Sequence, residues 1–224
     1  MEGSWLSASG ADGLAATIPA VVAVPDPDRR FGPLAERALR HGSPRLHLRP
    51  FALEDAAPLW QATRHPDFNA WLTWPQPTAP AELLARAQRM LAQMQGQQAC
   101  LLSAVDRGSG RWVGLYRMAA DLWRADEGWF ELGMWVHPDF WGAGLAAELH
   151  ALGTSLAFEG SDTPGLSART AAANVKAWKT LLRMGFERDH ACDIAVEGAP
   201  AHPGHVYRLG RLAWARATQQ PAAA

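Results

Sequence analysis

The sequence predicts a single α/β (α+β) domain in which a mixed central β-sheet is covered by helices. Its 224 residues are 48% hydrophobic and 19% charged, a composition that supports one sizeable core. Stretches with a period of two residues alternate with stretches of period 3.6, in the order strand, two helices, three strands, helix, strand, helix and closing strands. This order of elements predicts a mixed sheet with helices packed on it.

The first 43 residues are predicted to be a weakly ordered extension. Gly, Ser, Ala and Pro are scattered through this segment without a sustained period, although a short helix is compatible with residues 33–40. The domain itself is predicted to span residues 44–216. Residues 217–224 are predicted to form a flexible tail.

The first half of the domain is predicted from its patterns and breaker residues. A half-buried strand over residues 45–50 ends at Pro50, because proline cannot continue a hydrogen-bonded ladder. Negative charge at Glu54 and Asp55 favours the start of a helix that ends before Pro66. A second helix over residues 79–96 and a hairpin of strands over residues 100–106 and 112–119 are expected to follow.

The second half is predicted to alternate strands with helices. A strand is expected over residues 129–136 and a helix over residues 144–158, and the pattern is repeated over residues 166–172 and 174–184. Two closing strands, over residues 186–196 and 205–212, are expected to flank a loop rich in Gly, Pro and His.

The charge balance and the cysteine usage restrict the function class. Lys and Arg number 21 and Asp and Glu number 22, so no global field would hold a nucleic acid or an anionic membrane. No apolar stretch approaches the roughly 18 residues of a membrane span, and residues 1–13 lack the basic charge of a secretory signal. Two cysteines without ligand spacing fit a reducing compartment. We therefore expect a cytoplasmic enzyme or binding domain, without metal, nucleic-acid or membrane partners.

A glycine loop between a strand and a helix predicts an anion-binding site. The strand ends at Val136, the loop Gly142-Ala143-Gly144 follows, and a helix begins at once. Two glycines let the backbone approach a phosphate, and the first N–H groups of the helix point at it unpaired. Neither a Walker loop nor a complete dinucleotide fingerprint is present, which argues against nucleotide hydrolysis and NAD binding.

This segment carries a family resemblance. The string ELGMWVHPDFWGAGLAAEL over residues 131–149, followed by Asn174 and the Met-Gly-Phe that ends at Phe186, resembles the GNAT superfamily of N-acetyltransferases. Within it, the sequence is most similar to the bacterial ribosomal-protein N-terminal (alanine/serine) acetyltransferases, through the Arg-Leu-x-Leu-Arg-Pro opening at residues 45–50 and the Asp-Ala pair at residues 55–56. The resemblance covers about residues 44–214.

The resemblance implies that acetyl-CoA is the acyl donor and that the sheet is splayed at the cofactor site. It implies that a strand segment holds the pantetheine arm, that the glycine loop holds the pyrophosphate, and that an asparagine contacts the pantetheine where two parallel strands part. The implied cofactor-binding residues are Met134, Trp135, Val136, Trp141, Gly142, Ala143, Gly144, Leu145, Ala146 and Asn174.

Three positions depart from the family pattern. Asp139 stands where relatives often carry Gln or Arg, so one phosphate donor is missing. Ala177 and Phe186 stand where relatives carry a Ser or a Tyr that protonates the leaving thiolate. The general acid is therefore unassigned, with water and Tyr207 as candidates.

Glu131 is the candidate catalytic residue. A carboxylate beside the cofactor strand is placed to take a proton from an attacking ammonium, directly or through water. The alternative is a polar side chain on the outer face of a strand. Lys176 and Lys179 are either a solvated helix face or contacts of the 3′-phosphate of the cofactor.

We expect the acetyl group to pass to a primary amine, foremost a peptide or protein N-terminal α-amine, by direct attack in a ternary complex. Trp60, Trp71 and Trp74 are expected to wall the acceptor groove, with Trp123 opposite them; the alternative is that these rings belong to the core. Three functional alternatives stay open, namely a catalytically silent acyl-CoA-binding or sensing domain, an acetyltransferase for polyamines or aminoglycosides, and a succinyl-CoA-type transferase. Homodimerisation is open as well.

Overall fold

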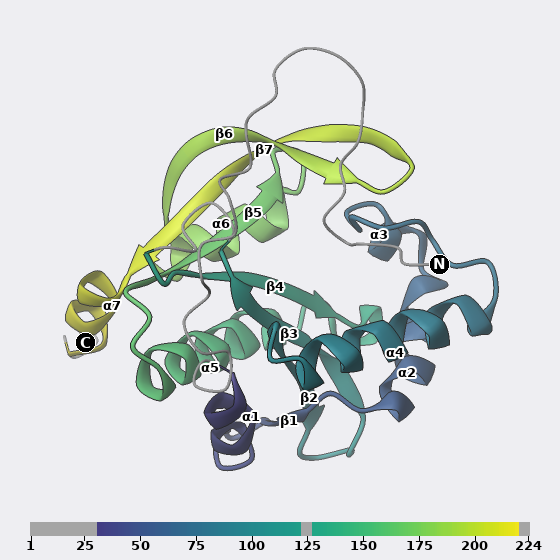
Figure 1. Ribbon diagram of the computed structural model, residues 1–224, viewed down its shortest axis with the longest axis horizontal. Coiled ribbons are helices and arrows are strands. Elements are labelled where there is room, and N and C mark those ends of the chain that lie inside the picture. The colour runs from purple at the N-terminus through teal and green to yellow at the C-terminus, as the bar shows by residue number, and fades with distance from the viewer. Residues whose placement is uncertain (1–30, 122–126, 220–224) are drawn as a thin grey trace.

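The central sheet has seven strands in the order β1-β2-β3-β4-β5-β7-β6 (Figure 1). The computed structural model describes residues 31–121 and 127–219. Neighbouring strands are antiparallel except β4 and β5, which are parallel, so the predicted α/β class with a mixed sheet is confirmed. The strands are β1 (Leu46–Pro50), β2 (Ala99–Asp106), β3 (Trp112–Ala120), β4 (Phe130–Val136), β5 (Gly165–Ala171), β6 (Glu187–Val196) and β7 (Ala199–Gly210).

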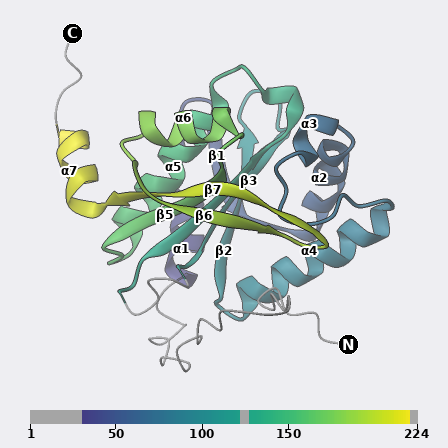
Figure 2. The same cartoon turned by 90° about the horizontal axis from the view of Figure 1, so that it is seen from above.

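Helices pack on both faces of the sheet (Figure 2). The α-helices are α1 (Gly32–Ala38), α2 (Ala56–Thr63), α3 (Pro66–Asn69), α4 (Pro80–Gln95), α5 (Leu145–Gly160), α6 (Val175–Arg183) and α7 (Arg211–Gln219). Helices α1 and α5 cover one face and enclose a large core, whereas α2, α3 and α4 cover β2 and β3 on the other face and enclose a small core. None of the described helices is both long and apolar enough to cross a membrane.

The side-chain pattern explains why the two cores form. Leu46 and Leu48 of β1 point to the large core because side chains two residues apart share a face of a strand. On α4, Leu83, Ala87 and Met90 lie at helical spacing and are buried in the small core.

The N-terminal boundary of the packed structure differs from the expectation. The sequence placed the whole of residues 1–43 outside the domain, but the ring of Phe31 lies 5.0 Å from that of Phe130 in the large core. Leu34 of α1 is fully buried against α5, where Gly160 has no side chain in its way. The sequence was compatible with this helix over residues 33–40, but it did not indicate that the segment packs into the core, because the contacts with Phe130 and α5 join distant parts of the chain. Residues 1–30 lie outside the described residues, so the expectation for them stays a prediction.

The closing hairpin is also longer than expected. The predicted Gly/Pro/His loop is mostly strand, because β7 begins at Ala199 and the turn consists of Glu197 and Gly198, the latter with φ 72°. Pro203 has no N–H to donate, but its carbonyl accepts a hydrogen bond from the backbone of Ala172.

The chain after β7 likewise differs from the expectation. The predicted strand to residue 212 stops at Gly210, and α7 continues to residue 219, beyond the predicted start of the tail. Trp214 anchors this helix, since its ring lies 5.0 Å from that of Phe158. An aromatic contact between distant segments leaves no local pattern, which is why the sequence did not indicate the helix.

The position of Leu34 yields a stability prediction. Replacing Leu34, which has no exposed surface, with Ala removes buried methyl groups and leaves a cavity, so the free energy of unfolding is expected to fall by about 2–5 kcal/mol. Leu39→Ala is the matched control, because Leu39 is 64% exposed and its truncation should change stability by less than about 0.5 kcal/mol. Urea denaturation of both variants measures the difference. Equal stabilities would mean that α1 does not pack as described.

Candidate functional site

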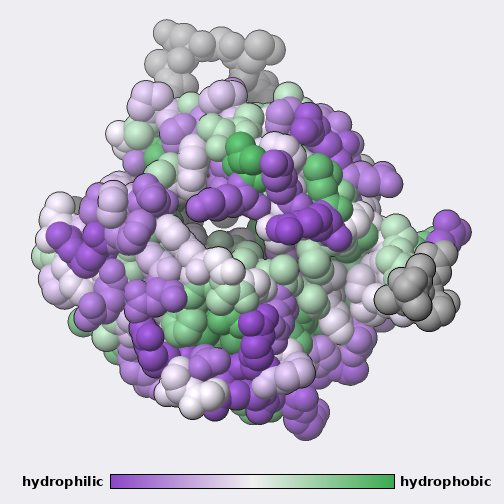
Figure 3. Space-filling view, turned by 180° about the vertical axis from the view of Figure 1, so that it is seen from behind, coloured by the Kyte–Doolittle hydropathy of each residue, from purple (hydrophilic) through white to green (hydrophobic). Residues whose placement is uncertain are grey.

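The parallel strands β4 and β5 separate after only three paired residues. Phe130, Glu131 and Leu132 pair with β5, and the pairing ends there although both strands continue. We call the gap between residues 133–136 of β4 and residues 169–171 of β5 the fork. The back of the molecule is hollowed near its centre, with hydrophilic side chains along much of the border (Figure 3).

The register of β4 determines which backbone groups face the fork. The N–H of Asp121 donates to the carbonyl of Trp129, and the N–H of His137 donates to the carbonyl of Val113, so the odd-numbered residues of β4 bond to β3. The even-numbered residues therefore direct their N–H and C=O groups toward β5. Past the paired segment these residues are Met134 and Val136.

Three predicted strand residues thus play different parts. Both backbone groups of Met134 face the fork. The carbonyl of Val136 is taken, because the indole of Trp141 donates to it at 2.9 Å, and only its N–H remains. Trp135 uses its backbone for β3 and points its ring at the small core, 6.5 Å from the ring of Trp74.

The glycine loop forms the predicted turn into a helix N-terminus. Gly142 and Gly144 have φ values of 80° and 77°, in the left-handed region that glycine adopts without strain. Gly144 is the N-cap of α5, and its carbonyl accepts the first intrahelical hydrogen bond from Glu148. The backbone N–H groups of Leu145 and Ala146 therefore lie in the first turn, where a helix has no acceptor for them.

A groove of about 690 Å³ runs between this loop and α6. Gly142, Gly144 and Ala146 line one side, and Lys176, Lys179 and Arg183 line the other. The helix N-terminus and three cations thus share one groove, which suits a ligand with several phosphates. The sequence analysis considered Lys176 and Lys179 as phosphate contacts but did not include Arg183. The position of Arg183 opposite the glycine loop depends on how α6 packs.

Arg45 holds the glycine loop from outside, a role that the sequence did not indicate. Its guanidinium donates to the carbonyl of Ala143 at 2.8 Å and to the carboxylate of Glu148 at 2.7 Å. Although burial alone would raise the pKa of Glu148, hydrogen bonds from Ser43 and Arg45 lower it, so the carboxylate stays charged. Asp139, the departure from the family pattern, pairs with Arg111 instead.

Asn174 stands at the other arm of the fork, between β5 and α6. Its side-chain oxygen accepts a hydrogen bond from the N–H of Ala177 at 3.3 Å and caps α6. The side-chain amide nitrogen has no hydrogen-bond partner among the described residues. Asn174 therefore keeps two donors for a ligand in the fork.

Glu131 lies on the face of the sheet that carries the small core, at the middle of the three positions that pair with β5 before the fork. Both of its oxygens accept hydrogen bonds from Arg169 of β5, at 2.8 and 2.6 Å. Arg117 of β3 lies on the same face and interacts electrostatically with both residues. Burial is the largest influence on Arg117 and lowers its pKa from the usual value. One carboxylate thus stands between two guanidinium groups, which the sequence reasoning did not foresee.

Of the three tryptophans predicted to wall the acceptor groove, only Trp71 is exposed, whereas Trp74 belongs to the small core and Trp60 lies in the helix layer. Trp74 is buried in the small core under the guanidinium of Arg86, and Trp71 is 39% exposed with its ring edge-on to His202 of β7. Trp60 of α2 packs on the small core with Arg64 over its ring. Trp123 lies outside the described residues.

The β6–β7 hairpin closes the far side of the same face. The N–H of Glu197 at its tip donates to the carbonyl of Thr73 at 3.0 Å, and the carboxylate of Glu197 pairs with Arg86. The hairpin therefore reaches across to the loop between α3 and α4 (Figure 1).

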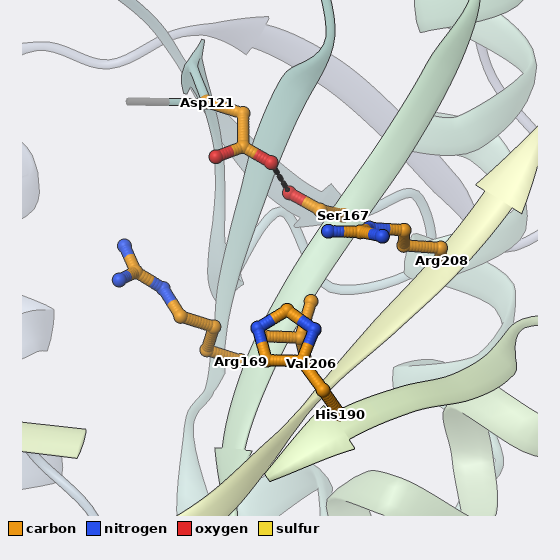
Figure 4. A pocket seen from close by; sticks show the side chains of 6 residues that line it. All are labelled: Asp121, Ser167, Arg169, His190, Val206 and Arg208. Atoms are coloured by element: carbon orange, nitrogen blue, oxygen red, sulfur yellow. Dashed lines mark hydrogen bonds between the residues drawn. The ribbon is translucent and has the colours of Figure 1, made fainter. Parts of the chain in front are cut away.

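A small pocket lies between β5, β6 and β7 on this face (Figure 4). Ser167 donates to Asp121 at 2.6 Å at one end of it, and His190 lies at the other end. Arg208 pairs with Asp189, while its Nε is buried without a hydrogen-bond partner. No group of three His, Cys, Asp or Glu side chains within residues 31–121 and 127–219 is arranged to hold a metal ion.

Comparison with known proteins gives a family match and several similar structures. Residues 45–187 match the family model described as acetyltransferase (GNAT) domain. RimL, a ribosomal alpha-N-protein acetyltransferase in complex with coenzyme A, is 20% identical with a TM-score of 0.63, over 75% of this chain and 95% of that one. The microcin self-immunity acetyltransferase MccE, in complex with acetyl-CoA and AMP, is 16% identical with a TM-score of 0.65, over 75% and 93%. RimJ of Mycobacterium smegmatis, in complex with a CoA-disulfide, is 17% identical with a TM-score of 0.64, over 79% and 85%.

The glycine loop yields a binding prediction. Gly144→Leu would place a side chain at a positive φ and move the loop, so coenzyme A is expected to bind at least about tenfold more weakly, equivalent to about 1.4 kcal/mol. Gly110→Leu is the control, because Gly110 also has a positive φ of 69° but lies in the β2–β3 turn. Calorimetric titration of both folded variants measures the affinities. Equal affinities would remove the loop from the binding site.

Proposed function

This chain belongs to the GNAT acetyltransferase family, and from that premise we propose that it acetylates the α-amine at the N-terminus of a peptide or protein. The observation that carries this proposal is the exposed ring of Trp71, which lies edge-on to His202 of the β6–β7 hairpin, while Trp74 is buried beside Trp135 of β4. Aromatic side chains suit an extended peptide. A polycationic acceptor would need several carboxylates around it. The segment that carries Trp71 and Trp74, residues 65–81, contains a single carboxylate, that of Asp67. The similarity to RimL supports the same acceptor class.

Acetyl-CoA is the proposed acyl donor, and the residues around the fork fit its chemistry. Met134 and Val136 would hydrogen-bond the pantetheine arm with backbone groups that no strand uses, and the Asn174 amide would donate from the other arm of the fork. The loop from Trp141 to Ala146 would hold the diphosphate. Lys176, Lys179 and Arg183 would neutralise the remaining phosphate charge across the groove.

The proposed reaction is a direct transfer between two bound substrates. The donor supplies a thioester carbonyl, and the neutral amine forms the new C–N bond while the C–S bond breaks. The N–H of Met134 would polarise the carbonyl, and the fork would hold amine and thioester in contact. The amine proton passes to Glu131, directly or through a water, and the leaving thiolate takes a proton from water. Glu131 can accept this hydrogen bond because each carboxylate oxygen has a second lone pair besides the one that faces Arg169.

The proposed role of Glu131 is tested by removing its charge. Glu131→Gln is expected to lower kcat by about 10²-fold while coenzyme A affinity is retained, because only acid–base help is lost. Arg169→Met is the control that breaks the same ion pair but keeps the carboxylate. Steady-state kinetics across pH separate the two variants. If Arg169→Met loses as much activity as Glu131→Gln, the ion pair and not the carboxylate matters.

The acceptor class is tested with a panel of amines. N-terminal peptides of varied sequence are expected to give a higher kcat/KM than spermidine or kanamycin, with coenzyme A release as the readout. Trp71→Ala should lower kcat/KM for peptides, because it removes a ring that is 39% exposed on the proposed acceptor side. Trp60→Ala is the control, because Trp60 lies in the helix layer and packs on the small core. Faster turnover of spermidine or kanamycin than of every peptide would overturn the assignment. Acetyl-CoA binding without any turnover would instead favour a silent acyl-CoA-binding domain.

A further inference from the structure

Arg117 has no direct partner where it lies. Among the described residues its guanidinium forms no hydrogen bond or ion pair, although it interacts electrostatically with Glu131 and Arg169. Glu131 gives both of its oxygens to Arg169, at 2.6 and 2.8 Å. Two cations therefore share one carboxylate, and the second cation is left with unused donors.

A partly desolvated guanidinium without a partner is unfavourable in the unliganded protein. A guanidinium has five N–H donors in one plane. Its preferred ligand is a carboxylate or a phosphate bound through two parallel hydrogen bonds. Burial removes water from around the guanidinium and lowers the pKa of Arg117, and because water is displaced, an anion that arrives there would find a charge poorly screened.

The position of Arg117 places such an anion beside the reacting groups. On β3, Arg117 is directly opposite Gly133, the first residue of β4 beyond the pairing with β5. Gly133 has no side chain, so the face of the sheet between Arg117 and the fork is not filled there. A ligand held by Arg117 would thus extend into the fork on the side of the proposed acceptor groove.

We propose that Arg117 binds a carboxylate of the acceptor, so that the preferred substrates are peptides with an acidic residue, Asp or Glu, at the first or second position. This inference rests on the proposed N-terminal acetylation and names its substrate class. Trp71, which is 39% exposed, would contact side chains further along the peptide. A phosphate on the acceptor is disfavoured, because its second negative charge would face Glu131 without a further partner.

The experiment compares peptides that differ only in charge. Peptides beginning Glu, Gln, Ala-Glu and Ala-Gln are assayed with wild type, Arg117→Met and Arg117→Lys. We expect wild type to favour a Glu peptide over its Gln counterpart by about tenfold or more in kcat/KM, because a hydrogen bond to a charged group is lost. Arg117→Met should abolish this ratio mainly through KM, and Arg117→Lys should retain part of it. Arg40→Met is the control for overall charge, since Arg40 is exposed beyond α1.

Several outcomes would overturn the inference. The first is a Glu/Gln ratio of kcat/KM near one for wild type at both peptide positions, and the second is an unchanged ratio in Arg117→Met. The third is an equal fall in kcat for all peptides in Arg117→Met, which would place Arg117 at the thioester instead. A readout that does not need turnover is calorimetric binding of the N-acetylated Glu and Gln peptides to protein saturated with coenzyme A. If free glutamate is acetylated faster than any peptide, the carboxylate site stands and the proposed peptide function fails.

Discussion

The separation of β4 and β5 after three paired residues is the constraint on which the site depends. Paired strands leave no unsatisfied backbone groups between them, so a sheet interior offers nothing to a ligand. Here both strands continue past Leu132 and Ala168 without pairing with each other, and the backbone of Met134 keeps a donor and an acceptor in the middle of the domain. Such groups are stable only where water or a bound molecule satisfies them. The fork thus determines where a long polar cofactor can lie.

Arg45, just before β1, and Arg49 of β1 connect this constraint to the rest of the fold. Arg45 holds the glycine loop through the carbonyl of Ala143. Arg49 donates to both oxygens of the buried Asp55, which also accepts from the hydroxyl of Ser103 and so fixes the start of α2 on β2. One short segment therefore positions the glycine loop with one side chain and the layer of α2 with another.

Local patterns predicted most of the fold and the turn of the glycine loop into α5, because both follow from short-range rules. Alternation and helical spacing located the main strands and helices, and Gly142 and Gly144 stand out as glycines between a strand and a helix. The missed features are long-range. Helices α1 and α7 are held by Phe31 and Trp214 against distant rings, and the pairing of Glu131 with Arg169 depends on the register of β4 with β5. Neither relation leaves a period in the sequence.

The same distinction separates the two sides of the reaction. The cofactor side consists mainly of backbone groups and a helix N-terminus, so most side-chain substitutions there leave its donors in place. The proposed acceptor side consists largely of side chains from three strands, with Glu131 between Arg169, which it pairs with, and Arg117, which interacts with it electrostatically. Exchanging one of these charged side chains would alter which acceptor molecules this face of the sheet attracts, without moving the backbone that is proposed to hold acetyl-CoA. Acceptor specificity can therefore diverge on this fold while donor binding is kept, and the charge balance among Arg117, Glu131 and Arg169 is where such a change would act.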